Sequence, residues 1–419
     1  MSMFKYYSIN FFLISLIILL FILLLCSGGL LIFSDSIIVV CDYFKFDSIA
    51  FYLVLLVVLL GVYSNCCFVD KLGCTSVRAF LLVSLIFSIL CFCVSHSILF
   101  WVFYELSMLP LLYLIFSSSP YSERFLAGWY FSCYLLVTSL PLVLMLIYLS
   151  IINNSWFFYD WHSENSSWWM LLVLSFIFFT KVPLVPFHTW LPIVHAEATS
   201  IVSIYLSGYI MKLGLLGVYR CSYFIFDSSL INYLFLCFLT SVCFLIVSCN
   251  ELDGKRWLAF LSLSHIVVPF IGLFISDVWV INNSFLYCLG HGLSAGIVFG
   301  LLWYLYDSSN SRNWLLLKSS INSKDIMLLV IVSILTLCSF PTTIQFFCEV
   351  GLIKYSAENY VYIFFWGLYL FFGGLVPLVL CGHLLIRSEW LEMFSYEKFT
   401  MFNFIVLLCL WCFTGLIII

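Results

Sequence analysis

The chain has 419 residues, of which 65% are apolar and only 9% are charged, and its formal net charge is −4. Soluble domains carry about 25% charged residues, so this composition excludes an ordinary soluble enzyme. The small negative charge argues against a nucleic-acid-binding protein. Apolar runs of about 20 residues, each long enough to cross a bilayer as a helix, recur along the whole chain. The sequence therefore predicts an all-α polytopic membrane protein.

We expect about thirteen transmembrane helices, because lipid-exposed backbone must satisfy its hydrogen bonds within each helix. The predicted starts lie near residues 8, 47, 77, 97, 126, 167, 199, 230, 256, 279, 324, 359 and 399. The connections between them are short, which leaves no room for a separate soluble domain. The apolar run 10–33 is longer than the core of a signal peptide and no clear cleavage site follows it, so we expect a genuine first helix.

The distribution of Lys and Arg supports this arrangement. With alternating helices, the side that holds the N-terminus collects Lys5, Lys71, Arg78, Arg124, Lys255, Arg256, Arg312, Lys318, Lys324, Arg387 and Lys398. The opposite side holds only Lys45, Arg220 and Lys354. Because inside loops carry an excess of positive charge, we expect the N-terminus to lie inside.

Six ionisable residues fall within the predicted helices. They are Glu105, Lys181, Lys212, His265, His291 and Glu349. A charge at the bilayer centre costs roughly 2.5 kcal/mol or more, so such residues are seldom present for packing alone. A carboxylate near a buried lysine changes its proton affinity, and histidine titrates near neutrality. The pattern therefore indicates a Lys–Glu pair and a Lys–His–His–Glu series that form a proton path.

Structural interpretations of the same residues remain open. Glu105 and Lys181 could form a static buried ion pair, and Lys212 could be purely structural. Either histidine alone could be an interhelical hydrogen-bonding residue. The 18 cysteines fall mostly inside the apolar runs, where a thiol behaves as a small hydrophobe, so we expect no disulfide and no metal–thiolate site.

Prolines are expected to break two of the predicted helices. Pro183 and Pro186 interrupt the sixth, and Pro341 interrupts the eleventh. The breaks lie five helices apart, so two repeated units would have opposite orientations, as in many transporters. We therefore expect a three-helix segment over 1–96, a first five-helix repeat over 97–250 and a second, inverted repeat over 251–419, all within one membrane domain.

The segment 181–220, KVPLVPFHTWLPIVHAEATSIVSIYLSGYIMKLGLLGVYR, resembles chain 4 of respiratory NADH–ubiquinone oxidoreductase (complex I). FYELSMLP, DGKRWLAFLSLSH, HGLSAG and FPTTIQFFCE resemble further motifs of the same family, so the likeness covers about residues 100–350. Thr342 and Gln345 depart from the second proline and the asparagine of the family motif, so we expect the second break to differ in shape. The family has an antiporter-like fold of fourteen helices, so we expect one fewer at the N-terminus here.

The resemblance implies a role for each marked residue. Glu105 and Lys181 would be the coupled pair, Lys212, His265 and His291 the central relay, and Glu349 the exit-side residue. A loop motif matches the family at His188, Trp190, Pro192, His195 and Glu197. We expect this motif to cap or anchor the loop rather than to bind a metal, because its spacing fits no common metal site.

The resemblance implies a proton-translocating subunit of NADH:ubiquinone reductase in the mitochondrial inner membrane, with its N-terminus in the matrix. The chain has no dinucleotide-binding glycine pattern and no iron–sulfur cysteine spacing, so NAD, FMN, iron–sulfur clusters and ubiquinone would belong to partner subunits. The expected partners are other membrane-arm subunits, including neighbouring antiporter-like chains, and membrane lipids. The alternatives are a subunit of a multi-subunit Na⁺/H⁺ antiporter or a non-conducting membrane scaffold. Chain 5 of complex I is less favoured, because its long lateral helix is not seen after the last predicted span.

Overall fold

The computed structural model describes residues 38–68, 71–72, 75–162, 167–226, 230–321, 323–386 and 399–415. The first predicted helix, near residue 8, lies outside the described residues. The same holds for three residues in the charge count, Lys5, Arg387 and Lys398.

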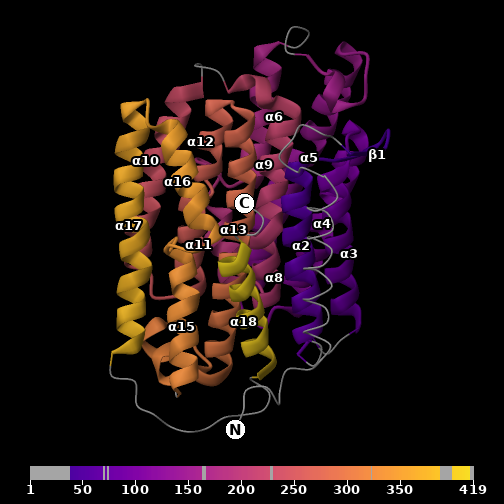
Figure 1. The fold of residues 1–419 in the computed structure, drawn as a ribbon. Coiled ribbons are helices and arrows are strands. Elements are labelled where there is room, and N and C mark those ends of the chain that lie inside the picture. The colour runs from indigo at the N-terminus through magenta and orange to yellow at the C-terminus, as the bar shows by residue number, and fades with distance from the viewer. Residues whose placement is uncertain are drawn as a thin grey trace.

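The described part is a bundle of nearly parallel helices (Figure 1). The longer ones are α2 (Ser48–Cys67), α3 (Thr75–Cys93), α4 (Ser97–Ser118), α5 (Arg124–Ile152), α10 (Ile231–Ser248), α13 (Val278–Ser309) and α17 (Tyr360–Leu385). The shorter ones are α6 (Trp168–Lys181), α7 (Trp190–Glu197), α8 (Ser200–Tyr205), α9 (Met211–Ser222), α11 (Gly254–His265), α12 (Val268–Ile275), α14 (Trp314–Leu317), α15 (Lys324–Leu337), α16 (Ile344–Ser356) and α18 (Phe399–Thr414). Single 3₁₀ turns occupy Phe158–Asp160, Tyr223–Ile225 and Lys318–Ser320.

One small departure from the all-α prediction is an antiparallel hairpin ahead of α2. It joins β1 (Ile38–Cys41) to β2 (Phe44–Phe46), with Ile38 opposite Phe46. The strands are too short and too few to form a layer of their own, so the helical architecture is unchanged.

The predicted helix positions agree with the structure. Every predicted start from residue 47 onward lies within two residues of an observed helix start. In the part of the chain that the structure describes, nine helical segments are long and apolar enough to cross a membrane. The protein is therefore a multi-pass membrane protein with mostly helical architecture. The total of thirteen helices stays a prediction.

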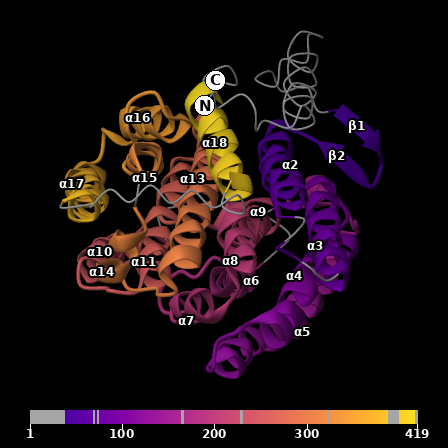
Figure 2. The ribbon, with the colours of Figure 1, turned by 90° about the horizontal axis from the view of Figure 1, so that it is seen from below.

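The core of the bundle lies along α8, α9 and α13. These helices occupy the middle of the molecule when it is seen from below, between α2–α5 and α10, α16 and α17 (Figure 2). The apolar stretch of α13 is buried along its full length and packs against α2, α12, α16 and α18. Only about a third of the apolar stretch of α10 or α17 is buried, and α5 exposes Trp129, Val137 and Leu140 by 65–70%. Such large exposed apolar side chains fit a lipid-facing rim.

Arginine contacts show which loops share an end of the bundle. Arg312, after α13, pairs with Glu197, which ends α7, and with Asp253, which precedes α11. Arg220, at the far end of α9, pairs instead with Asp47, before α2. This grouping agrees with the alternation used for the charge count.

The helix breaks occur at the predicted prolines. α6 ends at Lys181 and α7 begins at Trp190, with Pro183 and Pro186 in the irregular segment between them. α15 ends at Leu337 and α16 begins at Ile344, and Pro341 lies in that gap.

The backbone conformation at the second break excludes a continuous helix. Ser339 and Thr342 have φ angles of 49° and 89°, which a right-handed helix does not allow.

Two further irregularities were not predicted. Leu206–Ile210 forms a π-helical turn between α8 and α9, and the helical path is interrupted again between His265 and Val268. Pro269 was a visible signal for the second, whereas no strong signal marks the first. Both irregularities lie beside predicted pathway residues, which is where π turns are often found.

Candidate functional site

Lys181 and Glu105 are both buried at the centre of the bundle, 5% and 9% exposed. Lys181 is the last residue of α6, directly before the break, and its Nζ lies 5.8 Å from the centre of the Tyr104 ring. In the described part of the chain, neither Lys181 Nζ nor Glu105 Oε1 has a hydrogen-bonding partner. The two charges are within electrostatic reach of each other. The structure thus brings the predicted pair close together without direct contact.

A glycine on α9 allows the second lysine helix to pack closely against the break. A Cβ added at Gly214 would lie 2.6 Å from Val182 Cγ2 and 3.3 Å from Lys181 Cβ. Only a residue without a side chain permits this approach. The packing of α9 against α6 therefore places the two lysines on adjoining helices.

Lys212 is fully buried at the start of α9. Its Nζ donates a hydrogen bond of 2.5 Å to the backbone oxygen of Ser207, which lies in the π turn. Among the residues described, no carboxylate forms an ion pair with it. A backbone carbonyl in irregular helix is a common partner for a cation at membrane depth. The partner of Lys212 is therefore the backbone rather than an acidic residue.

His265 and His291 stack on each other at the end of α11 and the middle of α13. Their ring centroids are 5.2 Å apart with an interplanar angle of 16°, and each residue is at most 2% exposed. Over the described ranges, His265 Nε2 and both ring nitrogens of His291 have no hydrogen-bonding partner. The structure therefore unites two histidines that lie on different helices.

Three residues that the sequence analysis did not place on the pathway surround His265 Nδ1. Tyr287 Oη, Tyr369 Oη and Gln345 Nε2 lie 3.2, 3.2 and 3.1 Å from His265 Nδ1. Gln345 Nε2 also donates to Glu349 Oε1 at 3.3 Å.

Helical spacing could have revealed part of this set. Tyr287 precedes His291 by four residues on α13, and Gln345 precedes Glu349 by four on α16, so each pair shares a helix face. Tyr369, on α17, had no comparable signal.

The loop motif lies partly in the first break and partly on α7. Trp190 Nε1 donates to the backbone oxygen of Thr180 at 3.0 Å, which ties the start of α7 to the end of α6. His188 packs on Phe244 with ring centroids 4.8 Å apart.

The second half of the motif is buried on α7. Pro192, His195 and Glu197 are all buried residues of this helix. The His195 ring stacks on Phe299 at 5.0 Å. In the part of the chain that is described, no three His, Cys, Asp or Glu side chains are grouped as a metal site requires.

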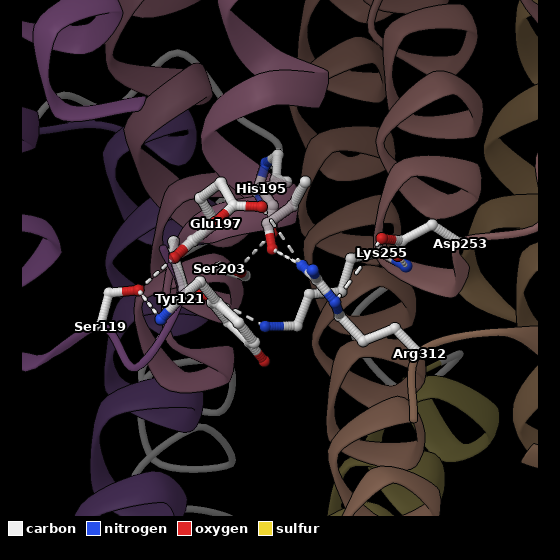
Figure 3. Close-up of polar contacts among 10 residues, drawn as sticks. Ser119, Tyr121, His195, Glu197, Ser203, Asp253, Lys255 and Arg312 are labelled. Carbon is white, nitrogen blue, oxygen red and sulfur yellow. Dashed lines mark hydrogen bonds and ion pairs between the residues drawn. The ribbon is translucent and has the colours of Figure 1, made fainter. Parts of the chain in front are cut away.

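Glu197 belongs to a charged cluster at the end of the bundle, which we call the Arg312 cluster: Tyr121, Glu197, Asp253, Lys255 and Arg312 (Figure 3). Arg312 Nη1 lies 3.5 Å from Glu197 Oε1, and Arg312 Nε lies 3.7 Å from Asp253 Oδ2. Its guanidinium covers the Tyr121 ring at 4.2 Å. Lys255 Nζ donates to the backbone oxygen of Ala198 at 2.8 Å. The cluster therefore joins four connecting segments that are far apart in the sequence.

Comparison with known sequences places these features in a family. Residues 94–375 match the transmembrane family model described as NADH:quinone oxidoreductase/Mrp antiporter. NADH-ubiquinone oxidoreductase chain 4 of Arbacia lixula is 31% identical over 58% of this chain and 56% of its own length. The chain 4 proteins of Rhipicephalus sanguineus and Ascaris suum are each 30% identical over 66% of this chain, covering 64% and 67% of their own lengths. The matched region thus spans between about half and two thirds of these relatives.

Solved structures with the same fold have lower sequence identity. A chain of respiratory complex I from Thermus thermophilus with bound NADH has a TM-score of 0.75 at 19% identity, covering 88% of this chain and 81% of its own. A chain of the Mrp complex from Dietzia sp. has a TM-score of 0.72 at 16% identity, covering 85% and 69%. The chain therefore belongs to the antiporter-like family of transmembrane subunits that includes NADH-ubiquinone oxidoreductase chain 4.

Proposed function

We propose that this chain is a proton-translocating membrane-arm subunit of NADH:ubiquinone oxidoreductase. The observation that carries the proposal is the row of buried ionisable groups through the core. Lys212 is held by a backbone carbonyl, and the stacked histidines lead through a hydrogen-bonded set to Glu349. Buried ionisable groups at membrane depth typically mark ion or proton pathways.

Each group has a distinct part in the proposed transfer. Glu105 alters the proton affinity of Lys181 through space, because a nearby opposite charge favours the charged form of a buried group. Lys212, His265 and His291 pass the proton along the core, and Glu349 releases it. A movement at the α6 break changes the distance between Glu105 and Lys181, and with it the charge state of the lysine. Coupling to a remote redox reaction is then allosteric.

The wider setting is part of the same proposal. The chain would lie in the mitochondrial inner membrane with its N-terminus in the matrix. Its partners would be other membrane-arm subunits, among them antiporter-like chains, together with lipids. NAD, FMN, iron–sulfur clusters and ubiquinone would be held by other subunits. The chain would divide into a leading segment, 1–96, and inverted repeats over 97–250 and 251–419.

A multi-subunit Na⁺/H⁺ antiporter is the second candidate, because the fold is shared with the Mrp complex. The curated relatives named above are chain 4 proteins, which favours the first candidate. The two differ in their dependence on NADH and on sodium.

The test is to solubilise the source membranes gently, separate the native complexes, stain for NADH oxidation and identify peptides in the active band. We expect peptides of this chain in that band. Recovery only from a smaller assembly without NADH activity would overturn the proposal. Proton uptake by that assembly that requires sodium would establish the antiporter alternative.

A further inference from the structure

Three side chains converge on a single nitrogen, His265 Nδ1. They are Gln345, Tyr287 and Tyr369, whose polar atoms lie 3.1–3.2 Å from it. The two tyrosine hydroxyls are themselves 3.1 Å apart. All three side chains are at most 2% exposed. This is more hydrogen-bonding capacity than one ring nitrogen can use at once.

The valence of the nitrogen makes these contacts alternatives. An imidazole nitrogen either donates one proton or accepts at one lone pair. An amide NH₂ group only donates, so Gln345 can bond to Nδ1 only while Nδ1 carries no proton. Glu349 Oε1, which accepts when the carboxylate is ionised, lies 3.3 Å from Gln345 Nε2, and this agrees with the orientation of the amide. A tyrosine hydroxyl can donate or accept, and therefore suits either state of the histidine.

Besides His265, Gln345 Nε2 has two further acceptors within reach, Glu349 Oε1 and Tyr287 Oη, the latter at 3.4 Å. The distance from Gln345 Nε2 to Glu349 Oε1 is 3.3 Å, and Ser339 Oγ donates to the same oxygen at 2.7 Å. The amide therefore bridges the histidine and the carboxylate but does not itself titrate. Tyr287 Oη and the Glu349 carboxylate thus contact the same amide, and Tyr369 Oη contacts Tyr287 Oη.

We propose that Gln345 is a positioning residue that holds His265 and Glu349 together, and that the hydroxyls of Tyr287 and Tyr369 carry the proton between them. This inference rests on the proposed function. A proton that binds at Nδ1 displaces the amide N–H, and the new N–H then donates to a tyrosine oxygen. That N–H bond breaks as an O–H bond forms, while the hydroxyl's own proton passes to Glu349, directly or through the second hydroxyl. One proton enters, one leaves, and each tyrosine ends neutral.

The length of the glutamine side chain is essential to this bridge. Gln345 Nε2 lies 3.1 Å from His265 Nδ1 and 3.3 Å from Glu349 Oε1, and an asparagine side chain is shorter by one methylene group. From the same backbone position, an asparagine amide would not reach both His265 and Glu349. We therefore infer that this chain uses Gln345 to span a distance that asparagine cannot.

The experiment compares Tyr287→Phe, Tyr369→Phe and the double variant in the assembled complex in proteoliposomes. Protons pumped per NADH oxidised and the solvent deuterium isotope effect on pumping are measured. Each hydroxyl contacts both His265 and the other hydroxyl, so one can partly replace the other. We therefore expect the protons pumped per NADH to fall about two- to threefold in each single variant. We expect the double variant to lose more than tenfold, with an altered isotope effect.

Gln345→Met keeps the size of the side chain but removes the amide. Gln345→Asn keeps the amide on a side chain that is shorter by one methylene group. Both are expected to lower the proton-to-NADH ratio by about half or more with normal assembly. A double tyrosine variant or a Gln345→Met variant that pumps normally would overturn the inference. Lys212→Met distinguishes failure of this inference from failure of the proposed function. If it abolishes pumping while the tyrosine pair is dispensable, only the inference fails, whereas normal pumping in Lys212→Met refutes the proposed function itself.

Discussion

The Arg312 cluster and the central row of ionisable residues use the same kinds of side chain in opposite ways. Arg312 has two carboxylates within 3.7 Å and an aromatic ring beneath it (Figure 3). Lys181 and His291, by contrast, have no hydrogen-bonding partner for their side-chain nitrogens in the described part of the chain. A paired charge keeps its ionisation state, whereas an unpaired buried group can change it at modest cost. The comparison separates residues that hold the bundle together from residues that we propose to carry protons.

Lys212→Met should have the largest effect on function. Methionine fills the buried site without a charge, and replacing buried ionic groups by apolar ones is often neutral for stability. We expect proton pumping to fall at least ~100-fold, which corresponds to about 2.7 kcal/mol. The measurement is NADH-driven acidification of inverted vesicles, with the amount of assembled complex checked on native gels.

Lys354→Met is the matched control, because this lysine is exposed on α16. It should pump normally. A Lys212→Met complex that assembles and pumps at the normal rate would contradict the central role of this lysine and would favour the scaffold interpretation.

Glu105→Gln should have the next largest effect. The change keeps the shape of the side chain and removes the only charge that couples α4 to Lys181 through space. Because Coulomb coupling of roughly 1–2 kcal/mol would be lost, we expect pumping to fall about tenfold while the complex still assembles. Glu123→Gln, at the exposed end before α5, is the control. If both variants pump equally well, the through-space coupling has no functional role.

Much of this arrangement could be predicted because it depends on local features. Apolar run length predicted the helix positions, and Pro183 and Pro341 predicted the breaks, because proline prevents continuation of a helix whatever surrounds it. The six ionisable residues were recognisable because a charge in an apolar run is rare.

Contacts between helices could not be predicted in the same way. No signal in the sequence indicated a partner for Lys212, and in the structure its partner is the backbone of a π turn. The bond from Gln345 to His265 joins residues 80 positions apart, and nothing in either segment refers to the other. The family motif marked Glu197, whereas its pairing with Arg312 depends on how two distant loops meet. Packing of the whole bundle determines these contacts.

Arg312→Met tests whether the Arg312 cluster stabilises the bundle rather than carrying protons. It leaves Glu197 and Asp253 without their cation, and removing one partner of a buried pair costs about 3–5 kcal/mol. Because Arg312 is 28% exposed, solvent screening reduces our expectation to about 1–2 kcal/mol. We expect a lower thermal unfolding temperature and less assembled complex, with normal pumping per assembled molecule. Arg256→Met, at an exposed neighbouring position, should change neither quantity. Loss of pumping in fully assembled Arg312→Met complex would show that the cluster also conducts.

Gly214→Ala should give the smallest effect. It tests the position of the two lysines without changing their charge. The added methyl group would lie 2.6 Å from Val182 Cγ2, so α9 and the α6 break must separate slightly. Overpacking of this kind costs about 1–3 kcal/mol, and it removes no ionisable group. Because the shift occurs next to Lys181, we expect a two- to fivefold loss of pumping that exceeds any loss of assembly. Gly367→Ala is the control, since a methyl group there would meet no atom within 4 Å. If Gly214→Ala lowers assembly and pumping in equal proportion, then the spacing of the two lysine helices matters for stability alone.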